Sequence, residues 1–184
     1  YIGTFQVVLS NPDYIYLDHP YEPNQDERGK YWATPYSDTR KIFNYMPDSL
    51  YEDIDQIKNC TNLKGCVDGR RNVLGRGLMF NANSVLDQTY QIILRVYPIG
   101  VEAAVWGETI RTPDHMFRML FPRLLALAER AWHKAPWETI GDRKAQDRER
   151  TGDWVKFANS LGYRELGRLD KMNVKYHLTP PGAR

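Results

Sequence analysis

Two pairs of aromatic and acidic residues carry the most distinctive chemistry in the sequence. Tyr16 and Asp18 lie two residues apart in YIYLD, and Trp106 and Glu108 repeat that spacing in VWGE. On extended backbone, residues i and i+2 point to the same side, so each pair would present a ring beside an acceptor-only carboxylate. A pyranose suits this combination, because its C–H face packs on a ring and its hydroxyls donate to carboxylates. Spacing alone leaves a second interpretation open, in which the rings pack in a core and the carboxylates are solvated.

Short strands and one long helix would have to position these pairs. Residues 5–10 form an apolar, β-branched run closed by Asn-Pro-Asp, and a brief extended piece over 14–18 follows. Residues 100–106 alternate as a second strand, with apolar side chains on one face. The sequence Thr-Pro-Asp then predicts the start of a helix over 113–133. Pro122 should kink or break this helix, since proline lacks the amide hydrogen that the helix needs.

The other segments show weaker periodicity. Residues 19–100 form a connection far longer than usual, which predicts functional loops with helix within 38–57 and within 83–95. Near the C-terminus we expect a helix over 153–161 that ends at the following glycine, and a helical turn over 164–172.

Strand, crossover, strand and amphipathic helix is the order typical of α/β folds with parallel strands. Two such units are visible in the sequence. Two strands cannot close a barrel or bury both faces of a sheet, so the sequence predicts a part of a larger α/β domain.

Several residues have an ordinary structural interpretation. Trp132, Trp137 and Trp154 are expected to pack among the outer helices. The arginines expected at the surface or in salt bridges are Arg28, Arg40, Arg70, Arg71 and Arg123. The four histidines are scattered without metal-ligand spacing on a common element, so no metal site or other cofactor is expected.

Bulk composition excludes some partners. The 25 basic and 23 acidic residues give a formal net charge of +2, too small a field to indicate nucleic acid or a lipid surface. No run of 18 apolar residues appears, so no membrane span is expected. The chain starts at Tyr1 rather than Met, which suggests a processed or truncated N-terminus.

A polar, turn-rich segment holds both cysteines. Cys60 and Cys66 are six residues apart, which favours a local disulfide, with two free thiols as the alternative. Asn59 starts an Asn-Cys-Thr sequence that fits the N-glycosylation pattern. Together these features predict an oxidising location: secreted, periplasmic or lysosomal.

Three blocks of the sequence resemble glycoside hydrolase family 20, especially its chitobiase-like β-N-acetylhexosaminidases. The blocks are EAAVWGETIRTPDHMFRMLFPRLLALAERAWHKAPWE, YLDHPYEPNQDERGKYWAT and DWVKFANSLGYRELGRLDKMNVKYHLTPPGAR. The resemblance implies the C-terminal portion of a (β/α)8 TIM barrel, namely its last two β/α units and closing helices. It divides the chain into a strand 7 region over 5–18, an active-site loop and insertion over 19–99, strand 8 over 100–108, outer helices over 113–172 and a domain exit over 173–184.

The same resemblance implies roles for individual residues. Tyr16 would donate to the N-acetyl oxygen of the substrate, and Asp18 would accept from a distal hydroxyl of the same sugar. Trp106 would form a wall of the acetamido pocket, and Glu108 would bind the O4 and O6 edge. Trp32 matches the residue that stacks on the next sugar, which favours chitin oligosaccharides over other glycans as substrates. The family hydrolyses terminal N-acetylhexosamine by substrate-assisted retaining catalysis, an exception to the usual pair of carboxylates.

The sequence departs from the family at the catalytic acid. The family's Asp-Glu pair lies in a His-x-Gly-Gly-Asp-Glu motif that is absent here, and Asp26-Glu27 has the wrong flanking residues. We therefore expect the isolated chain to be inactive and the upstream half of the barrel, from the same precursor or another chain, to supply the acid. The alternatives are a non-catalytic carbohydrate-binding or structural protein derived from the barrel and, more remotely, a regulatory module that uses the outer helices to bind protein.

Overall fold

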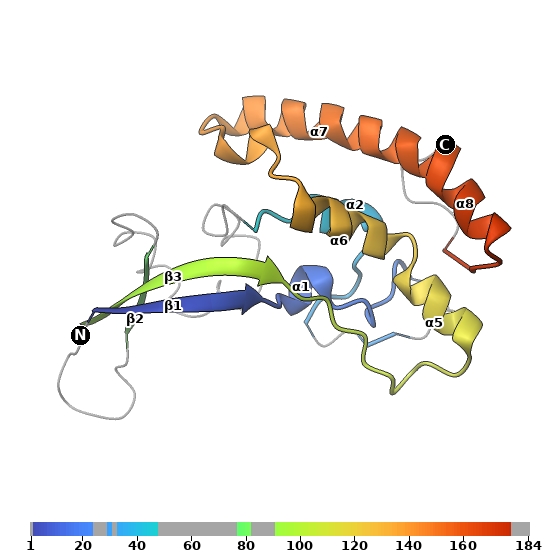
Figure 1. Ribbon diagram of the computed structural model, residues 1–184, viewed down its shortest axis with the longest axis horizontal. Coiled ribbons are helices and arrows are strands. Elements are labelled where there is room, and N and C mark those ends of the chain that lie inside the picture. Colours follow the sequence, from blue (N-terminus) through green and yellow to red (C-terminus); the bar gives the residue numbers. More distant parts are fainter. Residues whose placement is uncertain (1, 24–28, 31–32, 48–76, 82–90, 178–184) are drawn as a thin grey trace. The chain divides into compact units, whose positions relative to one another are not determined.

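A computed structural model describes residues 2–23, 29–30, 33–47, 77–81 and 91–177 (Figure 1). The chain forms two compact units. Unit 1 comprises residues 1–9 and 47–101, and unit 2 comprises residues 10–46 and 102–184.

Unit 1 contains a three-stranded sheet in the order β1-β3-β2. Strand β1 (Ile2–Leu9) lies parallel to β3 (Gln91–Val101), and Figure 1 shows these two strands side by side. Strand β2 (Gly77–Asn81) pairs with β3 in the antiparallel direction. Parallel neighbours need a long crossover connection, so the β1–β3 pair agrees with the predicted α/β class. The sequence analysis does not predict β2.

Strand β3 starts earlier and ends sooner than the sequence predicts. It covers residues 91–95, where we expected helix, and it ends at Val101 rather than continuing to 106. The helix prediction is wrong over 91–95, because pairing with both neighbouring strands outweighs the weak local pattern. Val7 pairs with Pro98 and Val8 with Gly100, so one extra residue of β3 forms an irregularity in the ladder. Proline suits such a position because it has no amide hydrogen to donate to the ladder.

Unit 2 begins with a single helical turn. Helix α1 (Pro12–Ile15) replaces the first part of the extended piece that we expected over 14–18. The cause is Asn11, whose side chain caps the turn, followed by a proline that suits the first helical position. After α1, Tyr16 forms a parallel bridge with Ala104. The amide of Leu17 donates to the Ala104 carbonyl over 2.7 Å, so these two segments lie side by side.

The long helix predicted over 113–133 is present in two pieces. Helix α5 (Pro113–Leu120) and helix α6 (Arg123–Trp132) are separated at Pro122, as predicted, and the peptide bond before this proline is cis. The hydroxyl of Thr112 accepts from the amide of His115 over 3.1 Å and so caps the start of α5, also as predicted.

Unit 2 has one more helix within residues 39–43 and four helical segments within residues 136–171. They are α2 (Thr39–Phe43), η1 (Pro136–Thr139), α7 (Arg143–Ser160), η2 (Leu161–Glu165) and α8 (Leu166–Lys171). Helix α2 confirms the helix expected within 38–57, and α8 confirms the turn expected over 164–172.

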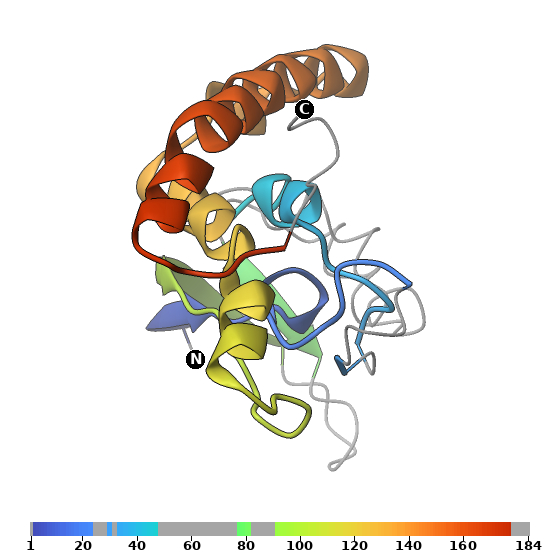
Figure 2. The same ribbon diagram turned by 90° about the vertical axis from the view of Figure 1, so that its right-hand side faces the viewer.

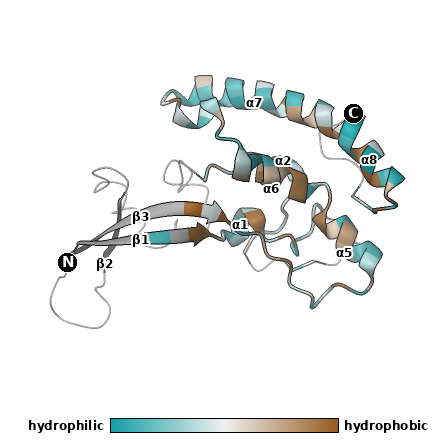
Figure 3. Cartoon of the chain, viewed as in Figure 1, coloured by the Kyte–Doolittle hydropathy of each residue, from teal (hydrophilic) through white to brown (hydrophobic). Residues whose placement is uncertain are grey.

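Helix α7 begins earlier than predicted and does not stop at Gly162. Asp142 caps its N-terminus, and an ion pair between Asp147 and Arg150 links neighbouring turns of its polar first half. At Gly162 the chain passes through the π-helical turn η2 into α8, and Figure 2 shows α7 and α8 as one bent helical segment. Figure 3 shows that most of α7 is hydrophilic. No helix in the described part of the chain is long and apolar enough to cross a bilayer.

An aromatic cluster joins α2 to the C-terminal helices. The Phe43 ring lies 6.2 Å from Trp137, 5.3 Å from Trp154 and 5.1 Å from Phe157, measured between ring centroids. Trp137 and Trp154 are each 2% exposed, which confirms their predicted packing role. The same prediction is wrong for Trp132, whose exposed fraction is 91% among the described residues. Location in a helical segment therefore does not by itself predict whether a tryptophan is buried.

Candidate functional site

Four residues singled out by the sequence meet at one cavity of unit 2. Tyr16, Asp18, Trp106 and Glu108 line a cavity of about 270 Å³, together with Lys30. The two pairs come from the two segments that the parallel bridge holds together. Backbone pairing thus brings residues that are about 90 positions apart in sequence to one site.

Asp18 is the most unusual group in this cavity. Its side chain is fully buried, and neither carboxylate oxygen has a hydrogen-bond partner among the described residues. Its backbone is well held, because its carbonyl accepts from the amide of Lys30 over 2.8 Å. A buried acceptor without a partner costs free energy, and native proteins retain such groups mainly where a ligand or water pairs with them. Asp18 is therefore equipped to accept hydrogen bonds from a bound hydroxyl or amide group.

Two aromatic rings line the same cavity as this carboxylate. The centroids of Tyr16 and Trp106 are 6.3 Å apart, with their planes inclined at 56°. The Tyr16 ring also stacks on His19, with a centroid distance of 6.4 Å and an interplanar angle of 22°. Trp106 is 51% exposed, so much of its indole surface can receive a ligand. An apolar ring next to a buried acceptor suits a ligand that has both a C–H face and hydroxyl groups.

Glu108 and Lys30 form the charged rim of the cavity. The Lys30 Nζ lies 3.5 Å from Glu108 Oε1, with side chains 40% and 58% exposed. Ion pairs at such exposure contribute little to stability and can open to admit a ligand. Lys30 was not predicted from the sequence, because no local pattern places it opposite a residue 78 positions later.

The backbone around Lys30 explains how it reaches the cavity. The His19 imidazole Nδ1 is hydrogen-bonded to the Lys30 carbonyl, while the Lys30 amide is bound to Asp18. A Cβ atom at Gly29 would lie 2.6 Å from the Asp18 carbonyl oxygen and 2.6 Å from the Pro20 nitrogen. Only glycine allows this close approach, so Gly29 is the sequence signal that could have indicated the contact.

Other predicted site residues lie outside the described residues. Trp32, the proposed stacking platform, is one of them. The proposed disulfide between Cys60 and Cys66 and the possible glycosylation at Asn59 also fall outside, so these remain predictions.

The histidines serve structural contacts. Among the described residues no group of three histidine, cysteine, aspartate or glutamate side chains is arranged to hold a metal ion. His177 stacks on Tyr21 with a centroid distance of 4.0 Å and an interplanar angle of 6°. Burial lowers the pKa of His177, and the Glu22 carboxylate 3.8 Å away opposes this shift only in part. Burial also lowers the pKa of His115, assisted by Arg118.

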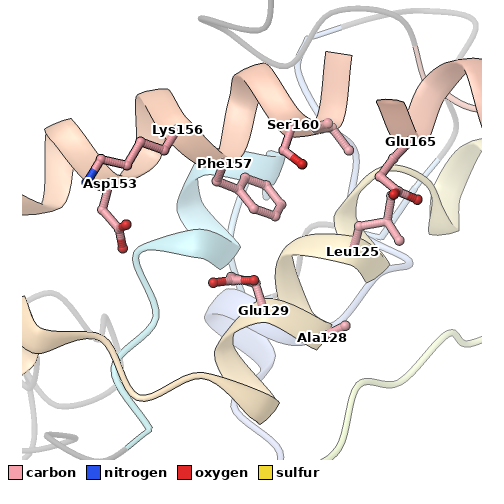
Figure 4. A pocket seen from close by; sticks show the side chains of 9 residues that line it. Leu125, Ala128, Glu129, Asp153, Lys156, Phe157, Ser160 and Glu165 are labelled. Carbon is pink, nitrogen blue, oxygen red and sulfur yellow. The ribbon is translucent and has the colours of Figure 1, made fainter. Parts of the chain in front are cut away.

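A second cavity of about 510 Å³ lies between α6 and the α7–η2 segment (Figure 4). Its carboxylates already have protein partners: Glu129 pairs with His133, Asp153 accepts from the Trp137 indole over 3.0 Å, and Glu165 pairs with an arginine one turn along. This cavity therefore lacks the unpaired acceptor found at Asp18. Its lining residues are Leu125, Ala128, Glu129, Asp153, Lys156, Phe157, Ser160, Leu161 and Glu165.

Comparison with known proteins places the chain in a family. The profile described as "Glycosyl hydrolase family 20, catalytic domain" matches residues 3–135, a range that includes every residue lining the first cavity. The chain is 36% identical to N,N'-diacetylchitobiase from Vibrio harveyi over 189 residues, covering 98% of this chain and 19% of that protein. It is 33% identical to a beta-hexosaminidase from Vibrio vulnificus over 196 residues, covering 97% of this chain and 20% of that protein.

Solved structures agree on the fold. A glycoside hydrolase family 20 β-N-acetylglucosaminidase superposes with a TM-score of 0.54 at 23% identity, covering 95% of this chain and 26% of that one. The inactive D437A mutant of the family 20 exo-β-N-acetylglucosaminidase from Vibrio harveyi gives 0.50 at 22% identity, covering 94% and 19%. The chain thus spans about a fifth of the length of the curated relatives it matches. On the profile match and the two curated relatives, the chain belongs to glycosyl hydrolase family 20.

Proposed function

We propose that this chain supplies one side of the substrate site of a β-N-acetylhexosaminidase that releases terminal N-acetylhexosamine from chitin oligosaccharides or related glycans. The observation that carries the proposal is the buried carboxylate of Asp18, which has no hydrogen-bond partner among the described residues and lines a cavity with Tyr16 and Trp106. The names of the two curated relatives, a chitobiase and a hexosaminidase, support the same activity.

The chemistry of the cavity matches an acetamido sugar. The Trp106 indole offers an apolar wall to the acetamido methyl and the C–H face, and Asp18 accepts a sugar hydroxyl. Glu108 binds the O4 and O6 edge at the exposed rim. The Tyr16 hydroxyl donates to the acetamide oxygen, which positions it as an internal nucleophile and stabilises the charge that develops as the oxazolinium-like ring closes.

The catalytic pair of the proposed enzyme comes from elsewhere. The sequence lacks the family's His-x-Gly-Gly-Asp-Glu motif, so an upstream half of the barrel, from the same precursor or another chain, supplies the general acid. In this proposal the 184 residues form the C-terminal part of a (β/α)8 barrel and are inactive alone. Secretion or another oxidising location, with Cys60 and Cys66 bonded, belongs to the same proposal.

Replacing Tyr16 by Phe tests the proposed mechanism in a protein where the chain completes a family 20 barrel. Loss of a transition-state donor should raise the activation free energy by about 2 to 4 kcal/mol. On a chromogenic N-acetylglucosaminide, kcat should therefore fall roughly 30- to 1,000-fold. Tyr36→Phe is the matched control, because Tyr36 is 42% exposed and does not line the cavity. Normal turnover in the Tyr16→Phe enzyme would remove this hydroxyl from the mechanism.

The missing acid motif favours one alternative, a carbohydrate-binding protein without catalysis. Such a protein would bind N-acetylglucosamine through Asp18 and Trp106 but would show no turnover when combined with the upstream half of a family 20 barrel. The same mixture should hydrolyse the substrate if the chain is part of an enzyme. Binding and turnover, measured on one preparation, therefore separate the two functions.

A further inference from the structure

Arg123, expected at the surface or in a salt bridge, is instead completely buried at the start of α6. Its guanidinium is surrounded by backbone carbonyl oxygens. Nη2 donates to Leu17 O over 2.6 Å, and Nη1 donates to His19 O over 2.6 Å and to Ser37 O over 2.9 Å. Nε donates to Met119 O over 3.0 Å, and Nη2 reaches the same oxygen. Every N–H group of the guanidinium thus has an acceptor.

Two of these acceptors flank Asp18 directly. The Leu17 and His19 carbonyls belong to the residues before and after it, and the Asp18 carbonyl accepts from the Lys30 amide. The backbone that carries the Asp18 side chain is therefore held on one side by Arg123 and on the other by Lys30. The carboxylate has no partner of its own among the described residues, so its position depends on this backbone.

Further contacts fix Arg123 itself. The guanidinium carbon lies 3.9 Å from the centroid of the Tyr21 ring, and that ring stacks on His177. The amide of His177 donates to the carbonyl of Phe121, two residues before Arg123, over 2.9 Å. A planar group that binds several carbonyls and lies over a ring cannot be replaced by the compact ammonium of lysine.

We propose that Arg123 is a positioning residue, which places the carboxylate of Asp18 for sugar binding through the carbonyls of Leu17 and His19. The inference rests on the proposed function for the identity of the ligand. It does not give Arg123 any contact with the substrate. It assigns the geometry of the site to a residue of α6 that lies 105 positions after Asp18 in the sequence.

The test compares two arginines of the same helix. Arg130 is also buried, at 2% exposure, but it pairs with Glu138 and lies over the rings of Phe43 and Trp137, away from the cavity. Arg123→Lys and Arg130→Lys, made in the 184-residue chain, should both lower stability toward urea. Only Arg123→Lys should weaken binding of N-acetylglucosamine, by about 10- to 100-fold, the range expected when a ligand loses one hydrogen bond to a charged acceptor.

Amide hydrogen exchange supplies a readout that does not depend on sugar binding. The Leu17 amide donates to Ala104, and the Lys30 amide donates to Asp18. Both amides should exchange at least about tenfold faster in Arg123→Lys than in Arg130→Lys. In the wild type, local opening of this segment must break the hydrogen bonds to Arg123, and the lysine variant lacks them. In the wild-type chain, the Arg123 Nε–H resonance should shift when N-acetylglucosamine binds; this measurement stands even if the variant does not fold.

Each result has one meaning. If the wild-type chain binds N-acetylglucosamine while both lysine variants bind it equally and exchange equally at Leu17 and Lys30, the positioning role is wrong. The positioning role is also wrong if the Arg123 Nε–H resonance does not shift when N-acetylglucosamine binds. If the wild-type chain binds no sugar even when it is combined with the upstream half of a family 20 barrel, the proposed function fails instead, and the exchange rates still decide whether Arg123 holds the Asp18 backbone.

Discussion

Replacing Asp18 by Asn should make the protein more stable and a poorer sugar binder. Asn has nearly the same shape but removes a buried charge whose oxygens have no partner among the described residues. Leaving a buried polar group unpaired costs about 1 to 3 kcal/mol, and more for a charged group. We therefore expect the free energy of unfolding, measured by urea denaturation, to rise by about 1 to 2 kcal/mol in Asp18→Asn.

Binding should change in the opposite direction. A hydrogen bond to a charged acceptor contributes about 1.5 to 3 kcal/mol, against about 0.5 to 1.5 kcal/mol for a neutral one. Each sugar hydroxyl that Asp18 accepts should thus lose about 1 to 1.5 kcal/mol, which weakens binding of N-acetylglucosamine roughly tenfold in calorimetric titration.

Asp13→Asn provides the control for this experiment. Asp13 is also a buried aspartate, at 3% exposure, but it lies in the first turn of α1 and does not line the cavity. Its replacement should leave the affinity for the sugar unchanged. The reasoning is refuted if Asp18→Asn destabilises the protein while sugar binding stays at the wild-type level, because Asp18 would then be an ordinary structural carboxylate.

Two further predictions concern stability away from the cavity. Glu138→Gln removes the charged partner of Arg130, whose Nη1 lies 3.2 Å from Glu138 Oε1 with both side chains fully buried, and should lower the free energy of unfolding by about 3 to 5 kcal/mol in urea. Arg130 keeps a longer ion pair with Glu129, at 3.9 Å, so an equal or higher stability would show that the buried Glu138 charge contributes nothing. Burial lowers the pKa of His177, so the unfolded chain binds protons more readily, and stability should fall as pH drops below about 6.5. Denaturation of His177→Gln between pH 7.5 and 5 should show a weaker fall than the wild type; parallel curves would exclude His177 as a cause.

The residues that line the first cavity could be predicted because their signals are local. The repeated spacing of a ring and a carboxylate left two interpretations open, and the family resemblance favoured a shared site. The structure places Tyr16, Asp18, Trp106 and Glu108 around one cavity. The break at Pro122 was also predictable, since proline acts on its own turn of helix. The individual roles of these side chains toward a sugar stay predictions.

The supporting residues could not be predicted because their partners are backbone atoms far away in sequence. Nothing in the residues around Arg123 shows that carbonyls of Leu17 and His19 will surround its guanidinium. Arginine side chains are mostly exposed in proteins, so Arg123 is expected at the surface until its contacts in the fold are known. The same limit applies to Trp132 and Trp137, five residues apart, of which one is exposed and the other buried.

In the proposed site, hydrogen bonding is divided between Asp18, which binds the ligand, and Arg123, which supports the backbone. Asp18 keeps both carboxylate oxygens without a partner among the described residues, whereas each N–H group of Arg123 has an acceptor. If a neighbouring side chain oriented the Asp18 carboxylate, that donor would compete with the ligand for the same oxygens. Holding the adjacent carbonyls instead fixes the carboxylate without occupying it. A binding site built in this way gains geometry from residues that never touch the ligand, so variants at such residues should change affinity without changing which chemical groups the ligand must present.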